Sequence, residues 1–215
     1  MTIETLHPAR IQQLIIAGWT GRDRIKQEKH IAELEALGVR RPASTPVYYR
    51  VAAARITIAS SIQVSGRDSS GEVEFVVFQI GGALWIGLGS DHTDRKAESI
   101  GVTLSKQLCP KIVAPEIWEW SSVAAHWDRL MLRSYATAGG ARALYQQGSV
   151  SAMRHPDDLM SRYGGFPAGT AMFGGTFATI GGVRWADEFH IELEDPALGR
   201  IIRHSYTIEA LPVEG

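Results

Sequence analysis

Three carboxylates form the strongest chemical pattern in the chain. Glu72 and Glu74 are separated by one residue, so in a β-strand both side chains point to the same face. Asp91 follows the next apolar run. Three carboxylate ligands with open coordination positions are typical of a protein site for Mg²⁺ or Mn²⁺. The same spacing also fits an exposed strand face for the two glutamates, with Asp91 as a turn residue or a helix N-cap. Both interpretations stay open.

The segments around these carboxylates predict a β-hairpin. Apolar side chains alternate with the glutamates and give the first strand an apolar back. Gly81-Gly82 is a turn of the hairpin type between two apolar runs, and residues 83–88 form the return strand. Asp91 then lies just past the end of that strand, and the return path brings it back towards Glu72 and Glu74.

A histidine and a glutamate form a second candidate pair in the amino-terminal part. Residues 22–37 have the apolar periodicity of a helix, and Gly38 is a suitable stop. His30 and Glu33 stand at positions i and i+3, so the carboxylate can orient the imidazole for proton transfer. Because the segment is rich in charge, an exposed helix with a solvated histidine is the alternative.

The rest of the chain predicts many short strands and few helices. Apolar or alternating runs indicate strands at 13–19, 46–53, 56–64, 130–136, 170–182, 189–195 and 201–211. Helical patterns lie at 94–104, 123–127, 138–148 and 155–163. No regular alternation of strand and helix is present. We therefore expect an α+β fold that is mainly β and antiparallel, in one domain spanning residues 1–215.

Composition and charge argue against several classes of protein. The 215 residues are 45% apolar and 21% charged, which is ordinary for a globular protein. A net charge of −1 gives no electrostatic footprint for nucleic acid or a membrane surface. Cys109 is the only cysteine, so there is no intrachain disulfide and no cysteine-rich metal site. Without a signal-peptide pattern or an apolar run of about 20 residues, a cytoplasmic protein is expected.

Other reactive residue types lack suitable neighbours in the sequence. His92 stands beside Asp91 and could touch a metal, although a surface histidine is the commoner case. His126 and His155 have nearby aspartates but no third ligand, and Cys109 lies among apolar residues, so we interpret all three as structural. No G-x-S-x-G nucleophile elbow and no P-loop occur.

Several motifs, taken in order, resemble those of a known family. The glutamates of 72–74 resemble the paired metal glutamates of the fumarylacetoacetate hydrolase family, and Ser-Asp-His-Thr-Asp-Arg at 90–95 resembles its Asn-Asp-x-Ser/Thr-Ala-Arg-Asp segment. Ser-Lys at 105–106 and Gly-Gly-Thr at 174–176 resemble its Gly-Lys-Ser/Thr and Thr-Gly-Thr stretches. The likeness extends over most of residues 12–210. Within the superfamily, the GSDHTDR and SKQ-CPK stretches resemble the DUF2848 subgroup.

The resemblance implies a fold and a class of chemistry. The fold would be a mixed β-roll with a few peripheral helices, and the protein would be a homodimer that binds Mg²⁺ or Mn²⁺. The implied activities are hydrolysis of carbon–carbon bonds in diketo acids, and decarboxylation, hydration or isomerisation of 2-oxo acids. By position, Glu72, Glu74 and Asp91 would bind the metal, which would hold a 2-oxo carboxylate and stabilise an enolate as a Lewis acid.

The resemblance also assigns roles to residues around this metal site. Lys106 would place a positive charge beside the enolate or carboxylate. Arg95 would anchor the substrate or the acidic cluster, and Thr176 would bind the substrate carboxylate. The pair His30–Glu33 would correspond to a His-x-x-Glu on a mobile lid helix, where it activates water or moves a proton.

Two functions from different classes follow. The first is a metal-dependent hydrolase or lyase that acts on a small 2-oxo or diketo acid. The second is a protein of the same fold that binds a small acid without turning it over. Convergence of Glu72, Glu74, Asp91 and Lys106 on one cavity favours the first, whereas a carboxylate pointing into solvent favours the second.

Overall fold

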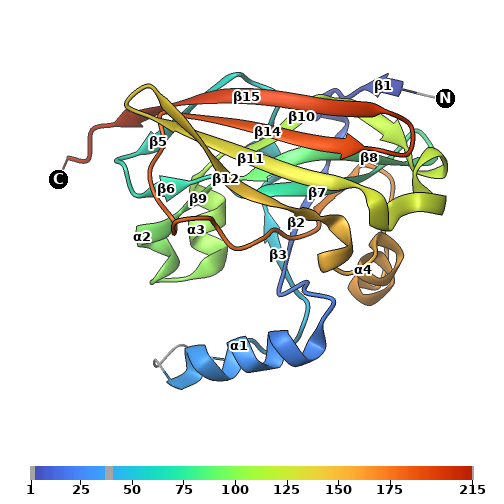
Figure 1. Cartoon of the computed structure of the whole chain (residues 1–215), viewed down its shortest axis with the longest axis horizontal. Helices are drawn as coiled ribbons and strands as arrows, with labels where there is room; N and C mark the ends of the chain where they lie inside the picture. Colours follow the sequence, from blue (N-terminus) through green and yellow to red (C-terminus); the bar gives the residue numbers. More distant parts are fainter. Residues whose placement is uncertain (1–2, 37–40, 215) are drawn as a thin grey trace.

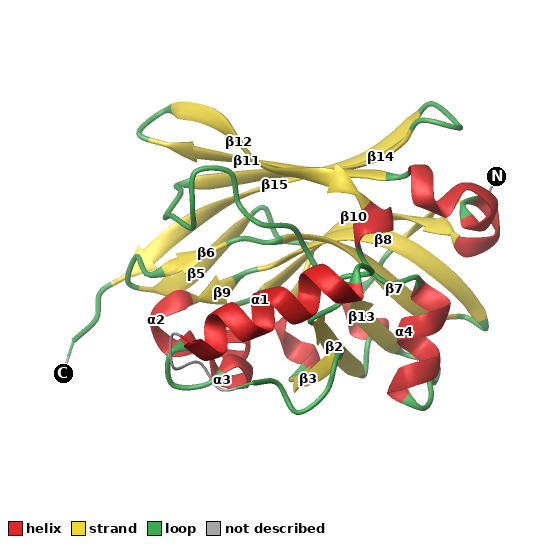
Figure 2. Ribbon diagram, turned by 60° about the horizontal axis from the view of Figure 1, so that its bottom comes forward, coloured by secondary structure: helices red, strands yellow, loops and turns green. Residues whose placement is uncertain are grey.

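Two stacked β-sheets with helices on one side make up the molecule. The computed structural model describes residues 3–36 and 41–214. A five-stranded sheet lies over a larger sheet, and helices α2 (Arg95–Glu98), α3 (Val102–Leu108) and α4 (Pro156–Tyr163) lie on the far side of the larger sheet (Figures 1 and 2). The architecture is therefore mainly β with few helices, as the sequence predicts.

The larger sheet has eight strands and mixes parallel with antiparallel pairs. Its strands are β1 (Ile3–Thr5), β2 (Gln13–Gly18), β3 (Val47–Val51), β4 (Ile56–Thr57), β7 (Val73–Ile80), β8 (Ala83–Asp91), β10 (Lys111–Glu119) and β13 (Thr170–Phe173). They follow the order β1-β10-β8-β7-β13-β2-β3, with β4 beside β10. The β13–β2 and β10–β4 pairs are parallel, and the remaining pairs are antiparallel.

The second sheet has five strands in the order β12-β11-β14-β15-β5. Its strands are β5 (Ser61–Ser65), β11 (Met131–Ala138), β12 (Ala141–Ser149), β14 (Glu188–Asp195) and β15 (Arg200–Leu211). Only β15–β5 is parallel in this sheet. A short antiparallel pair, β6 (Ser69–Ser70) with β9 (Thr93–Asp94), lies next to the central hairpin in sequence.

Both faces of the larger sheet are buried, which explains why its strands read as nearly continuous apolar runs. In β7, Val73, Phe75 and Val77 pack between the two sheets. Val76 and Phe78 point the other way, into a second cluster on the opposite face. Glu74 alternates with the first set and therefore lies on the face of the second cluster.

The predicted hairpin is confirmed. Strands β7 and β8 pair antiparallel through Gly81 and Gly82, whose φ angles of 62° and 80° fit a two-residue type I′ turn. Asp91 is the last residue of β8 instead of lying just past it. The predicted helix at 22–37 corresponds to α1 (Arg24–Ala36), which stands away from the sheets beyond β2 and β3 (Figure 1).

Three sequence-based predictions of elements are wrong. Residues 138–148 were expected to be helical, but β12 pairs with β11 across the turn Gly139-Gly140, since that pairing satisfies the backbone and buries Tyr145. The single strand expected at 56–64 is two strands, β4 and β5, which join different sheets. The helix expected at 94–104 is likewise divided into α2 and α3, since Gly101 precedes α3 as its N-cap.

Within the described residues, no helix is both long enough and apolar enough to cross a membrane.

Candidate metal and substrate site

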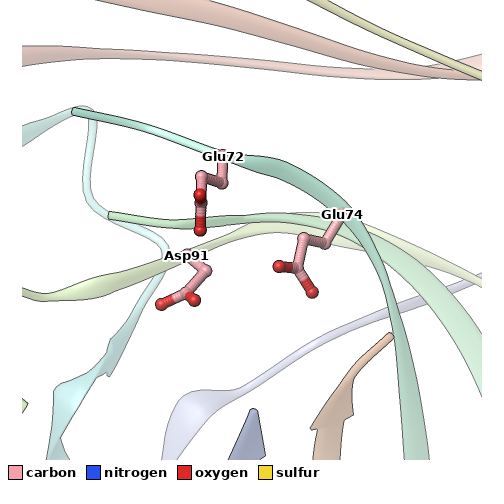
Figure 3. A group of neighbouring side chains, drawn as sticks. All are labelled: Glu72, Glu74 and Asp91. Carbon is pink, nitrogen blue, oxygen red and sulfur yellow. The ribbon is translucent and has the colours of Figure 1, made fainter. Parts of the chain in front are cut away.

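The three carboxylates named above converge at one end of the β7–β8 hairpin. The backbone N–H of Asp91 donates to the carbonyl of Glu72 at 2.9 Å, which sets the two residues opposite each other, and Glu74 lies opposite Gly89. One carboxylate oxygen from each of Glu72, Glu74 and Asp91 lies within 4.8 Å of the other two. Figure 3 shows the carboxylates turned towards a common space.

Burial of these carboxylates makes their mutual repulsion costly. Asp91 is fully buried, Glu74 is 2% exposed, and the Glu72 side chain is 18% exposed. Burial raises the pKa of Glu74 well above its ordinary value, and the charges of Asp91 and Glu72 raise it further. A cation placed among the three would relieve that repulsion.

Two lysines hold Asp91 in its ionised form. The Lys106 ammonium donates to Asp91 Oδ2 and lies 3.8 Å from Glu72 Oε2, while Lys111 Nζ lies 2.9 Å from Asp91 Oδ1. Burial alone would raise the pKa of Asp91, but the two ammonium groups outweigh burial and lower it to about 2. Asp91 in turn raises the pKa of Lys106 against the lowering effect of burial, so Lys106 stays charged.

The donor set fits a hard divalent cation. Carboxylate oxygens are the ligands that Mg²⁺ and Mn²⁺ prefer. Asp91 is neutralised by its lysines, whereas Glu74 is buried and makes no ion pair among the described residues, its Oε2 accepting from the Gly175 N–H. A buried carboxylate without a cationic partner, with an oxygen within 4.8 Å of one from each of two more carboxylates, fits a cation ligand.

Arg95 lies beside this cluster and is engaged by it. Its Nη2 is 3.0 Å from Glu72 Oε1, its Nη1 donates to Glu98 Oε2 at 3.2 Å, and its Nε donates to Ser70 Oγ at 2.8 Å. Burial lowers the pKa of the guanidinium, but Glu72 and Glu98 outweigh burial and raise it. In this arrangement Arg95 orients Glu72, and its role towards a substrate stays a prediction.

The glycine-rich loop after β13 contributes backbone and one hydroxyl. The Gly175 N–H donates to Glu74 Oε2 at 2.6 Å. The Thr176 hydroxyl donates to the Val73 carbonyl at 2.7 Å and accepts from Gln146 Nε2 at 2.8 Å. Thr176 therefore fixes the loop against β7 and β12, and its predicted contact with a substrate carboxylate is untested.

The predicted pair on α1 lies outside what the structure describes. The backbone of His30 and Glu33 belongs to α1, but the side chains of these two residues are not among those described. Their assigned role in proton transfer stays a prediction.

Sequence reasoning missed Lys111 and misplaced His92. Lys111 is fully buried and donates to the His92 carbonyl. Its position at the start of an apolar strand was a usable signal, since a buried ammonium needs a charged partner.

His92 is not a surface residue: it is fully buried, with Nε2 2.9 Å from Ser69 Oγ and Nδ1 3.1 Å from the Tyr206 hydroxyl. Burial and then Lys111 lower its pKa to about 3.

A cavity of about 1490 Å³ opens onto the cluster. Glu72, Glu74, Lys106, Arg95 and Thr176 all line it. It is also lined by the loop that follows β2 and by residues between α2 and α3. The structure therefore brings five of the eight predicted site residues to one cavity, with Asp91 buried directly behind them.

Comparison with known proteins identifies the sequence family. The model of the family described as Protein of unknown function (DUF2848) matches residues 17–206. No curated protein matches the chain.

Solved structures share the fold at low sequence identity. Yeast ynq8, a fumarylacetoacetate hydrolase family protein, has 17% identity and a TM-score of 0.68, with 96% of each chain covered. Cg1458, solved with an inhibitor, has 14% identity and a TM-score of 0.70, covering 94% of this chain and 78% of the other. The 2-keto-3-deoxy-D-arabinonate dehydratase complexed with magnesium and 2,5-dioxopentanoate has 16% identity and a TM-score of 0.64, covering 95% and 75%. These similarities establish the fold of the fumarylacetoacetate hydrolase family.

Proposed function

Because the chain belongs to the DUF2848 family, we propose that it is a divalent-metal-dependent hydrolase or lyase acting on a small 2-oxo or diketo acid. The proposal rests on the fold together with the site that it carries. A distant neighbour of the same fold was solved with magnesium and 2,5-dioxopentanoate, an oxo acid. The cofactor would be Mg²⁺ or Mn²⁺, held by Glu72, Glu74 and Asp91.

One observation carries the proposal. Three carboxylates have oxygens within 4.8 Å of one another, and two of them, Glu72 and Glu74, line a cavity of about 1490 Å³ beside a buried ammonium group. A purely structural cluster would pair each buried carboxylate with a cation, yet among the described residues the 2% exposed Glu74 has a backbone N–H as its partner and no ion pair. Charge concentrated against a cavity is the arrangement expected of a functional site.

The chain's own residues supply positioning and charge. A bound Mg²⁺ or Mn²⁺ would act as a Lewis acid that stabilises an enolate of the substrate. Lys106 would hold a positive charge at the edge of the cavity, where it attracts the substrate carboxylate. Arg95 fixes Glu72, and the Gly175 N–H fixes Glu74, so that both ligands are oriented before a cation arrives. His30 and Glu33 are proposed to move the proton.

A protein that binds a small acid without turning it over is the alternative. This possibility follows because function depends on the site and not on the fold. The two functions share the metal and the acid and differ only in turnover. Product formation from acylpyruvates or oxaloacetate, measured with His30→Ala as a comparison, separates them.

Calorimetric titration of metal-free protein with Mg²⁺ and Mn²⁺ tests the metal site. Wild-type protein should bind one ion per chain, and Glu72→Gln and Glu74→Gln should weaken binding by at least about tenfold, since each removes one charged ligand. Asp91 is unsuitable as a first variant because its loss leaves the fully buried Lys111 ammonium without its carboxylate partner.

The control is Glu194→Gln, which removes from β14, in the other sheet, a carboxylate that is paired with Arg133. It should bind metal as the wild type does. If the wild type binds neither ion, even with oxalate present to complete the coordination shell, the proposed function fails.

We also propose that the protein is a homodimer, as the resemblance implies. Sedimentation equilibrium should then give twice the chain mass of 23.5 kDa. A mass of one chain at micromolar concentration would contradict this.

A further inference from the structure

The cavity has a second wall that the metal chemistry does not use. Besides the carboxylates it is lined by Trp19, Tyr49, Val102 and Ala17. A pyruvate-sized acid at the carboxylate end would leave most of the 1490 Å³ unfilled. The residues of this second wall are therefore expected to contact the rest of the substrate and to select its substituent.

Trp19 is held in a costly backbone conformation at this wall. Among the described residues it is the one non-glycine residue with positive φ, at 57°. A bulky residue in the left-handed region is strained, and such strain persists mainly where the surroundings impose it, often at ligand sites. Gln27 Nε2 donates to the Trp19 carbonyl and anchors the loop in this conformation.

Tyr49 joins Trp19 to the charged end of the cavity. A hydrogen bond links the side chain of Tyr49 to Trp19. The Tyr49 ring packs on the backbone of Gly18, where an added Cβ would lie 2.8 Å from its Cε2. Lys106 Nζ lies 5.9 Å from the ring centroid. Tyr49 thus contacts Trp19 through a hydrogen bond and lies near the Lys106 ammonium.

The arginines that line the cavity are already paired within the chain. Arg22 makes two bonds of 2.8 Å to the Asp128 carboxylate, and its Nε donates to the Met153 carbonyl at 3.0 Å. Arg95 is shared between Glu72 and Glu98. Among the described lining residues, Lys106 is the cation placed to meet a substrate carboxylate. Lys106 is itself paired with Asp91 and adjoins the metal ligands, so a second carboxylate, farther from the metal, would find no unpaired positive charge among the described lining residues.

We infer that the substrate is a 2-oxo monocarboxylic acid whose other end is an uncharged, apolar or aromatic group packed against Trp19 and Tyr49. This inference rests on the proposed function and narrows it, because it excludes 2-oxo dicarboxylic acids as preferred substrates. Trp19 and Tyr49 determine specificity, whereas the carboxylate cluster provides the metal site.

Binding of four probes to the magnesium-loaded protein tests the inference. The probes are oxalate, pyruvate, phenylpyruvate and 2-oxoglutarate, and affinities are measured by calorimetry. Phenylpyruvate should bind at least about tenfold more tightly than pyruvate or 2-oxoglutarate, because an aromatic ring buried against aromatic side chains gains more than about 1.4 kcal/mol.

Trp19→Gly is the decisive variant. Glycine tolerates φ of 57°, so this change removes the indole and relieves strain instead of adding it. Phenylpyruvate affinity should fall to within about threefold of pyruvate, while oxalate, which reaches only the metal end, binds as before. The control Trp185→Ala removes an indole that pairs with Arg67 and Asp187 outside the cavity, and it should keep the preference.

The charge argument has its own variant. Asp128→Asn frees the Arg22 guanidinium, so the affinity for 2-oxoglutarate should rise several-fold relative to phenylpyruvate. An unchanged ratio would contradict the exclusion of dicarboxylates by paired charge.

The outcomes separate the two proposals. Tighter binding of 2-oxoglutarate than of phenylpyruvate by the wild type, or an undiminished preference in Trp19→Gly, would overturn the inferred substrate class and leave the metal site intact. Absence of oxalate binding to the wild type would overturn the proposed function and the substrate class with it.

Discussion

At the scale of single residues, Lys106 has two opposing effects on the site. Its ammonium contacts Asp91 and lies 3.8 Å from Glu72, close to where a metal ion would be bound. Lys106→Met should therefore tighten Mg²⁺ binding at least about tenfold, because it removes a like charge from near the ion. The same change should weaken oxalate binding to the loaded protein by a similar factor. Calorimetry of both steps measures the two effects, and a parallel loss of both affinities would show that Lys106 only maintains the fold.

Glu74 should make the metal-free protein less stable as pH rises. Its pKa in the folded state is raised well above 4.5, first by burial and then by Asp91 and Glu72. The folded state thus favours the protonated form, so the stability it contributes is complete below the unfolded pKa and is lost as pH rises through the folded pKa. The pKa of Asp91 is lowered to about 2, so Asp91 changes the stability only below about pH 3.8, outside the range in which Glu74 acts.

Urea unfolding of metal-free protein between pH 5 and 9 measures this effect. The wild type should lose stability towards high pH, and Glu74→Gln, which cannot ionise, should show a flatter profile and be the more stable protein at pH 8. Saturating Mg²⁺ should restore the stability of the wild type and leave that of Glu74→Gln nearly unchanged. Parallel profiles for the two metal-free proteins would contradict the raised pKa.

At the scale of elements, the loop after β13 couples the fold to the site through Gly175. Its φ is 106°, an added Cβ would lie 1.8 Å from Thr20 Oγ1, and its N–H holds Glu74. Gly175→Ala should lower the free energy of unfolding by about 2–4 kcal/mol, from overlap and backbone strain combined, and it should weaken Mg²⁺ binding.

Gly182→Ala is the matched control: its φ is 82°, but nothing lies within 4 Å of the added Cβ. This control should lower the free energy of unfolding by about 1 kcal/mol and leave metal binding unchanged. Equal effects of the two changes on metal affinity would contradict the coupling.

The elements that were predictable from sequence are those whose local signals agree with their tertiary surroundings. The hairpin around Gly81-Gly82 has turn residues and apolar flanks that specify the same structure. In residues 141–149 the local and tertiary signals disagree. Their composition favours a helix, and only pairing with β11 makes them a strand. The division of 56–64 between two sheets was equally invisible, because period-two alternation does not say which partner a strand will find.

At the scale of the whole molecule, the carboxylate cluster was predictable because it lies on one hairpin. Glu72, Glu74 and Asp91 need only the turn and the register to meet. The second wall of the cavity was not predictable, since Trp19 and Tyr49 come from distant β2–α1 and β3 segments that meet only in the folded protein. Sequence motifs thus led to the chemistry of the site, while its specificity required the structure.

Metal binding should be visible in the stability of the entire chain. A ligand that binds only the folded state at 100 times its dissociation constant adds about 2.7 kcal/mol, which for a chain of this length raises Tm by about 5–10 °C. We therefore expect such a rise for wild-type protein in saturating Mg²⁺ or Mn²⁺. Glu72→Gln should show little or no rise, because the ligand set is incomplete, whereas Glu194→Gln should match the wild type. Differential scanning calorimetry with and without EDTA measures the shift. An equal rise in Glu72→Gln would mean that the ions stabilise the protein at some other place, and the carboxylate cluster would then lose its assigned role.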